Sequence, residues 1–124
     1  MRGEAKRKHH HLQAWQEAMG LVKLVYEASA AFPREEVYGL TSQVRRAAVS
    51  VPSNIAEGAA RGTDKEFLQF LYTARGSLSE VETQLLLARD LGYVLDVSLI
   101  EASIDKVFGL LGGLIKSIQE RNKK

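Results

Sequence analysis

Hydrophobic residues recur at alternating intervals of three and four positions through four separate stretches of the chain. This spacing places the hydrophobic side chains on one face of an α-helix. It predicts helices over about residues 12–31, 40–60, 63–91 and 98–118. Because no stretch alternates as a strand does and the connections are short, we expect an all-α fold, an antiparallel up-and-down four-helix bundle.

Each predicted helix has one stripe that we expect to face the core. The four stripes, in chain order, are Leu12, Trp15, Met19, Val22, Tyr26 and Ser29; Leu40, Val44, Ala47, Ala48, Val51, Ile55 and Ala59; Phe67, Leu71, Ala74, Leu78, Val81, Leu85 and Ala88; and Val97, Ile100, Ile104, Val107, Leu111, Leu114 and Ile118. Packing these stripes together would give one domain with one core.

The expected helix ends carry capping or helix-breaking residues. Pro33 pushes the residue before it out of helical geometry and ends the first helix. Thr63 begins the third helix with the spacing of a capping box, and Gly92 suits the left-handed position that ends it. Either Asp96 or Ser98 caps the fourth helix.

Pro52 interrupts the second hydrophobic stripe, although a proline removes the hydrogen bond to the carbonyl of Ala48 and crowds it. The helix could continue with a kink at Pro52, or it could break there, with Pro52 starting a new helix. We expect the continuous helix with a kink at Pro52. The small neighbours Ala47, Ala48 and Ser50 leave room for either arrangement.

The third and fourth helices carry more hydrophobic residues than one bundle seam uses. The surplus consists of Leu68, Phe70, Tyr72, Leu86, Leu87, Leu99, Phe108, Leu110 and Ile115. Exposed surface of this extent usually indicates a partner, whereas the alternative is a wide core stripe with scattered surface residues. Gly109, Gly112 and Gly113 each cost the helix roughly 1 kcal/mol, and close approach by another subunit would explain them.

Positive charge is concentrated at the two ends of a chain whose net charge is +2. Residues 1–10 carry +3 and residues 119–124 carry +2, so the body between them carries −3. We expect a flexible basic arm over residues 1–11, a bundle over 12–118 and a basic tail over 119–124. The candidate nucleic-acid contacts are Arg2, Lys6, Arg7, Lys8, Arg121, Lys123 and Lys124. Both termini of such a bundle lie at one end, where they would form a basic pole for phosphates; tails that only aid solubility are the alternative.

Several protein classes are disfavoured by composition. The chain has no cysteine, which excludes disulfides and thiolate metal sites. Its first residues lack the hydrophobic core of a signal peptide, and no hydrophobic run is long enough to cross a bilayer. We therefore expect a cytoplasmic protein with no membrane partner.

The sequence offers no recognisable catalytic motif. The only histidines are His9, His10 and His11, which lie in the expected arm and cannot hold a nucleophile–base geometry there. Such a run binds transition metals only weakly without further fixed ligands. The segment "GLLGGL" lacks the residues of a phosphate loop, and no glutamate has a histidine three positions later, as a di-metal bundle needs. We expect no enzyme activity, no cofactor and no small-molecule substrate.

Polar residues also recur at helical spacing on the second and third helices. We call this set the polar seam: Arg46, Ser50, Asn54, Glu57, Arg75, Ser79, Glu80 and Glu82. A fold about residues 61–62 would bring Arg46 level with Ser77 and Ser50 level with Thr73, with Glu80 in reach of Arg46. We predict a hydrogen-bonded ion-pair network that sets register and partner choice more than stability; a solvated helix face is the alternative.

The segments "RRAAVSVPSNIAEGAAR" and "FLYTARGSLSEVETQLLLARDLGY" resemble a known family. They are similar to four-helix bundle proteins related to those encoded in 23S ribosomal RNA intervening sequences, and the likeness extends over about residues 12–94. The motif positions are Arg46, Ser50, Pro52, Asn54, Glu57, Arg75, Ser77 and Glu80, without an assigned chemical role. The resemblance implies no catalytic activity and a barrel-like homopentamer. It also implies a fold similar to the accessory protein of diversity-generating retroelements, which binds nucleic acid and a reverse transcriptase. The acidic body departs from the basic character of that accessory protein.

Two functions follow as hypotheses. The first is a non-enzymatic oligomeric bundle, a homopentamer that acts as an interaction or scaffold protein. The alternative is an RNA-binding accessory protein that uses the basic pole, where oligomer symmetry would multiply a weak contact.

Overall fold

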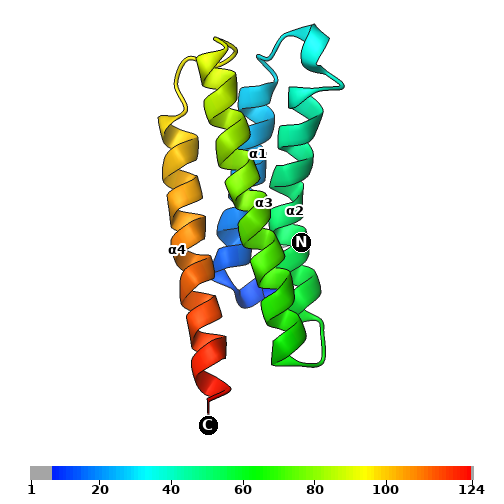
Figure 1. Ribbon diagram of the computed structural model, residues 1–124, viewed down its shortest axis with the longest axis vertical. Helices are drawn as coiled ribbons and strands as arrows, with labels where there is room; N and C mark the ends of the chain where they lie inside the picture. The colour runs from blue at the N-terminus through cyan, green and yellow to red at the C-terminus, as the bar shows by residue number, and fades with distance from the viewer. Residues whose placement is uncertain (1–6, 124) are drawn as a thin grey trace.

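The structure, a computed structural model, describes residues 7–123 (Figure 1). Its elements are the short 3-10 helices η1 (Lys8–His11) and η2 (Arg34–Glu36), and the α-helices α1 (Gln13–Ser29), α2 (Leu40–Ala59), α3 (Asp64–Asp90) and α4 (Ser98–Arg121). These residues contain no strand, and the prediction of an all-α protein with four long helices is confirmed. None of the helices they form is both long enough and apolar enough to span a membrane.

The four long helices lie side by side around a shared core. Both α1 and α3 pack against α2 and α4, and in Figure 1 the colour of the chain runs up α1, down α2, up α3 and down α4. Hydrogen bonds agree with this path, because the end of α4 meets the start of α3 through Arg121 and Asp64. The core therefore lies along the axis, and each pair of neighbouring helices forms one outer face.

The sequence predicts the core faces of α2, α3 and α4 well. All seven predicted residues of α2 are buried. On α3 only Phe67 is half-buried, and on α4 only Leu114 is. Ile115, which the sequence pattern places in the surplus, is 4% exposed and belongs to the core.

The predicted core face of α1 is wrong by a rotation about the helix axis. The residues that α1 buries are Ala14, Ala18, Leu21, Val25 and Ser29. Of the predicted stripe only Ser29 is among them, while Trp15, Met19 and Val22 are half-buried and Tyr26 is 43% exposed. Two apolar stripes adjoin on this helix, and small alanine side chains let α1 approach its neighbours closely, so the bulkier stripe lies at the edge.

The α2 helix continues through Pro52, which is buried within it. The alternative of a break with a new helix at Pro52 is therefore wrong, whereas a kink at Pro52 stays a prediction. The absence of an amide hydrogen at this position costs one backbone hydrogen bond, which the packing of a mainly hydrophobic buried face offsets.

The packing of α2 on α3 depends on Gly58. A Cβ atom at Gly58 would lie 2.8 Å from Phe70 Cβ and 2.9 Å from Phe67 Cδ1. Phe67 and Phe70 pack against Gly58 and so set the register of α3 on α2. In this register the Ser50 and Ser77 hydroxyl oxygens lie 2.8 Å apart. Ser77 rather than Thr73 is thus level with Ser50, one helical turn away from the predicted register.

Capping residues fix the helix ends largely as predicted. The Thr63 hydroxyl accepts a hydrogen bond from the Glu66 amide at 3.2 Å, and Gly92 has a left-handed φ of 80°. At the start of α4 the Asp96 carboxylate accepts from the Ser98 amide at 2.9 Å, so Asp96, of the two candidates, supplies the cap.

A contact that the sequence does not predict joins the two connections at the end of the bundle opposite the C-terminus. Tyr93, after α3, donates a hydrogen bond to Glu36 Oε2 at 2.8 Å, and Glu36 Oε1 accepts from the Leu40 amide at 3.0 Å. Glu36 therefore caps α2 and also holds the later connection. These bonds lower the pKa of Glu36, chiefly through the Leu40 amide and next through Tyr93.

Candidate functional site

Part of the polar seam forms a hydrogen-bonded row between α2 and α3. Asn54 Nδ2 donates to Ser50 Oγ and to the Ser50 carbonyl, both at 2.8 Å. A hydrogen bond of 2.8 Å joins Ser50 Oγ to Ser77 Oγ, and either hydroxyl can be its donor. Ser77 is only 7% exposed, so this row is a fixed feature of the helix packing.

The row borders a hollow of about 380 Å³ between the two helices. Its lining residues are Gln43, Arg46, Ala47, Ser50, Ser77, Glu80 and Gln84. Arg46 and Glu80 thus share one site, but none of the salt bridges among residues 7–123 joins them. The predicted ion pair is absent there, and the seam is held by hydroxyl and amide groups.

The other members of the polar seam lie away from this hollow. Glu57 forms a salt bridge of 2.7 Å with Arg61, whose guanidinium lies over the Phe70 ring at 4.8 Å. The Arg75 guanidinium lies over the Tyr72 ring at 5.3 Å.

Tyr72 also accepts a hydrogen bond from Gln119 of α4 at 2.9 Å, so this part of α3 faces α4. Ser79 donates to the carbonyl of Arg75 at 3.3 Å. Glu82 follows Ser79 by three residues and therefore lies on the same side of the helix. The structure does not bring these residues to α2.

Gln84 is the residue of α3 in the hollow that the sequence pattern misses. Ser77 and Gln84 are seven residues apart, as are Gln43 and Ser50, which is about two helical turns. The register of Ser50 on Ser77 therefore sets Gln43 level with Gln84. A search for polar residues in that register would have found Gln84.

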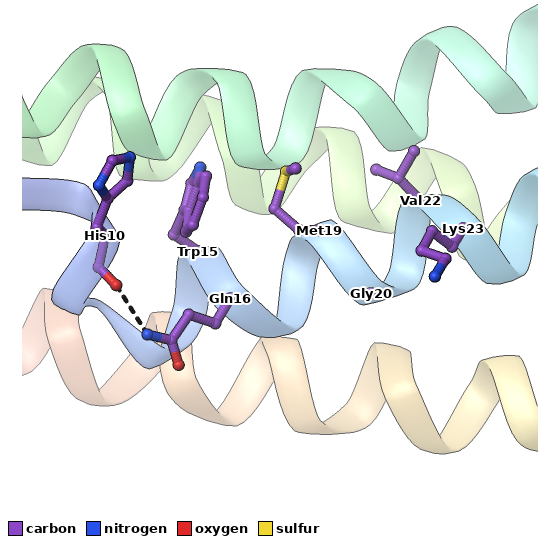
Figure 2. Close-up of a pocket in the computed structure, with 7 residues that line it drawn as sticks. All are labelled: His10, Trp15, Gln16, Met19, Gly20, Val22 and Lys23. Carbon is purple, nitrogen blue, oxygen red and sulfur yellow. Dashed lines mark hydrogen bonds between the residues drawn. The ribbon is translucent and has the colours of Figure 1, made fainter. Parts of the chain in front are cut away.

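A second hollow, of about 670 Å³, runs along the outside of α1. It is lined by His10, Trp15, Gln16, Met19, Gly20, Val22 and Lys23. Figure 2 shows Trp15, Met19 and Val22 on the side of α1 toward α2, while Gln16 reaches back to donate to the His10 carbonyl at 2.7 Å. The hydrophobic stripe that the sequence assigns to the core is therefore the floor of a surface groove.

Residues 8–11, directly before α1, pack beside this groove. Although residues 1–11 are expected to form an arm, residues 8–11 are the 3-10 helix η1, which contacts α1 and α2. The His9 and His10 rings pack on Trp15 with centroid distances of 5.0 and 5.2 Å. Burial is the main cause that lowers the pKa of His9, followed by the charges of His10 and Arg7. Within residues 7–123 no three metal-ligating side chains gather.

The C-terminal basic segment pairs with Asp64, at the start of α3. Arg121 donates to both carboxylate oxygens of Asp64, at 2.8 and 2.6 Å. These hydrogen bonds lower the pKa of Asp64, and the charges of Arg121 and Lys8 lower it further. Asp64 therefore offsets part of the positive charge at this end of the bundle. Arg7 and Lys123 are exposed, whereas Arg2, Lys6 and Lys124 lie outside the described residues.

The hydrophobic surplus of α3 and α4 is only partly covered. Leu87 is 48% exposed and Leu99 is 70% exposed. A Cβ atom added at Gly109, Gly112 or Gly113 would meet no atom within 4 Å. Among residues 7–123 no close approach explains these glycines, so they leave an open surface on α4.

A family model described as 23S rRNA-intervening sequence protein matches residues 10–113, which include the end of η1, all of α1, α2 and α3, and most of α4. No curated protein matches the chain.

Proposed function

The chain belongs to the 23S rRNA-intervening sequence protein family, and we propose that it acts as a non-enzymatic, homo-oligomeric interaction protein. Its subunit is an antiparallel up-and-down four-helix bundle, kinked at Pro52, and five subunits close a ring. The assembly acts in the cytoplasm as a scaffold for a partner.

The observation that supports the proposal is the half-buried stripe of Trp15, Met19 and Val22 along the α1 groove. These are large hydrophobic side chains at regular helical spacing, yet the core of the bundle uses the neighbouring stripe instead. Full burial of such a side chain is worth roughly 1.5–3 kcal/mol. Covering the exposed minority of these three side chains therefore favours association by roughly 1–2 kcal/mol.

A closed ring requires two different faces on each subunit, because head-to-tail contacts join unlike surfaces. The α1 groove provides one face. The exposed hydrophobic residues of α3 and α4, of which Leu87 and Leu99 are examples, provide the other. The open glycine surface of α4 would allow close helix contact beside them.

Light scattering coupled to gel filtration tests this assembly through the mass of the particle. We expect five times the 13.7 kDa of one chain at micromolar concentration. Met19→Lys, which places a charge on the groove floor, should lower the mass. Leu95→Lys, at a loop residue that is 93% exposed, is the matched control and should leave the mass unchanged. A monomer in the unmodified protein would contradict the proposal.

The charges of Lys8 and Arg121 both act on the Asp64 carboxyl, and this favours RNA binding as a second candidate function. In a ring the basic pole would be repeated in every subunit, which strengthens a weak contact. Binding of a structured RNA at two salt concentrations tests it. We expect the slope of the logarithm of the binding constant against the logarithm of the salt concentration to decrease in magnitude by about 0.7–0.9 for each phosphate contact that is removed. An unchanged slope after Lys8→Gln and Lys123→Gln would rule out the basic pole.

A further inference from the structure

We propose that the hollow between α2 and α3 binds a primary carboxamide, the side chain of an asparagine or glutamine that a partner polypeptide presents. This site goes beyond the subunit contacts proposed for α1, because it lies on a different face of the bundle. We call it the amide hollow; its lining residues are those given above.

The first argument is a buried acceptor that has no donor. Of the buried side-chain N and O atoms in residues 7–123, only Gln84 Oε1 lacks a hydrogen-bond partner. An unsatisfied buried polar atom costs about 1–3 kcal/mol. Gln84 is a lining residue of the amide hollow, so a rotation of its terminal amide would bring this oxygen to a group with an N–H that enters the hollow.

The second argument is that the base of the hollow is held rigid. Asn54 donates to Ser50, and Ser50 meets Ser77 across the two helices. This row fixes the relative height of α2 and α3. It therefore holds Gln84 opposite Gln43 before any ligand arrives, so binding would cost little ordering of the site.

The third argument is the charge at the rim. Arg46 and Glu80 both line the hollow and are exposed, and no ion pair within the described residues joins them. A carboxylate ligand would be repelled by Glu80, and an ammonium ligand by Arg46. A neutral carboxamide suits both, because its carbonyl accepts from a guanidinium and its NH₂ group donates to a carboxylate.

The amide of such a ligand has two N–H bonds and one carbonyl. One N–H would reach Gln84 Oε1, the second would reach Glu80, and the carbonyl would accept from Arg46. At about 380 Å³ the hollow is larger than a carboxamide group, so it also has room for the backbone that carries the side chain. We therefore identify the ligand as a polypeptide segment.

An NMR titration of the isotope-labelled full chain tests the site, with N-acetyl-asparagine methylamide as the probe. The corresponding aspartate and leucine derivatives are the controls for charge and size. We expect the asparagine probe alone to shift the signals of the Gln84 side-chain NH₂ and of the Ser77 and Glu80 amides. Absence of these shifts, or equal shifts with the aspartate probe, would overturn the proposal.

Gln84→Met keeps the length of the side chain and removes the acceptor. It should weaken binding of the asparagine probe about tenfold, as expected for one lost hydrogen bond. Gln69→Met makes the same change at an exposed position of α3 outside the hollow and should bind as the unmodified chain does. Unchanged affinity in Gln84→Met would overturn the proposal.

Folding and assembly are checked on the same variants. Because Gln84→Met removes an unsatisfied atom, we expect its unfolding temperature to be at least that of the unmodified chain. Its mass by light scattering should also be unchanged, so failure of this site and failure of the proposed oligomer are distinguishable.

Discussion

Replacement of Gly58 by alanine tests how α2 packs on α3. Alanine normally stabilises a helix relative to glycine by about 0.5–1 kcal/mol. Here the new Cβ would lie 2.8 Å from Phe70 Cβ and 3.3 Å from the Phe67 carbonyl oxygen. These atoms are attached to the α3 backbone and cannot rotate away, so the helices must separate.

Such overpacking costs about 1–3 kcal/mol, which exceeds the gain in helix propensity. We expect Gly58→Ala to destabilise the protein by about 1–2 kcal/mol net. Urea unfolding followed by circular dichroism would show a midpoint lower by about 0.5–1 M. Protein concentration must be held constant, because assembly couples to stability.

Gly76→Ala is the matched control inside α3, at an exposed position where a Cβ would meet no atom within 4 Å. It should stabilise the protein by up to about 1 kcal/mol. The two glycines are thus expected to respond with opposite signs. If Gly58→Ala raised the urea midpoint as Gly76→Ala does, Gly58 would not set the register of α3, and the reasoning would be refuted.

Three further predictions concern single hydrogen bonds. The hydrogen bonds of Glu36 lower the pKa of its carboxyl, so the stability they provide is present above about pH 4.5 and is lost as the pH falls through the lowered value. Tyr93→Phe should therefore lower the unfolding temperature at pH 7, and the difference from the unmodified protein should shrink at pH 3. An equal difference at both pH values would contradict this linkage. Arg121→Gln removes the main cause of the lowered pKa of Asp64, so an NMR titration of that carboxyl should show a higher pKa, and an unchanged value would show that the ion pair does not form in solution. Ser50→Ala removes one hydrogen-bond partner from Asn54 and one from the Ser77 hydroxyl. We expect the free energy of unfolding, measured in urea, to fall by about 1–2 kcal/mol. An unchanged free energy would show that the hydrogen-bonded row between α2 and α3 is not fixed.

Periodicity predicted most of the fold because three helices have a single dominant stripe. On α2 the residues between the predicted core positions are polar or small except for Val49 and Pro52, so the buried face is clear. On α1 two stripes compete, and a pattern based on hydrophobicity favours Trp15 and Met19 over Ala14 and Ala18. Which of the two stripes is buried depends on how closely α1 packs against α2 and α4. That distance is set by the residues of those helices and cannot be read from the sequence of α1 alone.

The candidate site was predictable in its residues but less so in its pairing. Arg46 and Glu80 do share a hollow, yet the expected register is one turn off because the seating of Phe67 and Phe70 on Gly58 is a tertiary effect. The Glu36–Tyr93 bond joins residues 57 positions apart, and no local pattern indicates it.

The central claim is that subunits meet through the α1 groove, and Trp15 reports on that groove directly because it is the only tryptophan of the chain. The decisive measurement is its fluorescence emission and acrylamide quenching over a dilution series, alongside particle mass. As the mass falls toward that of one chain, we expect the emission to shift to longer wavelength and the quenching constant to rise. Dissociation with no change in either Trp15 signal would place the interface elsewhere and contradict the account.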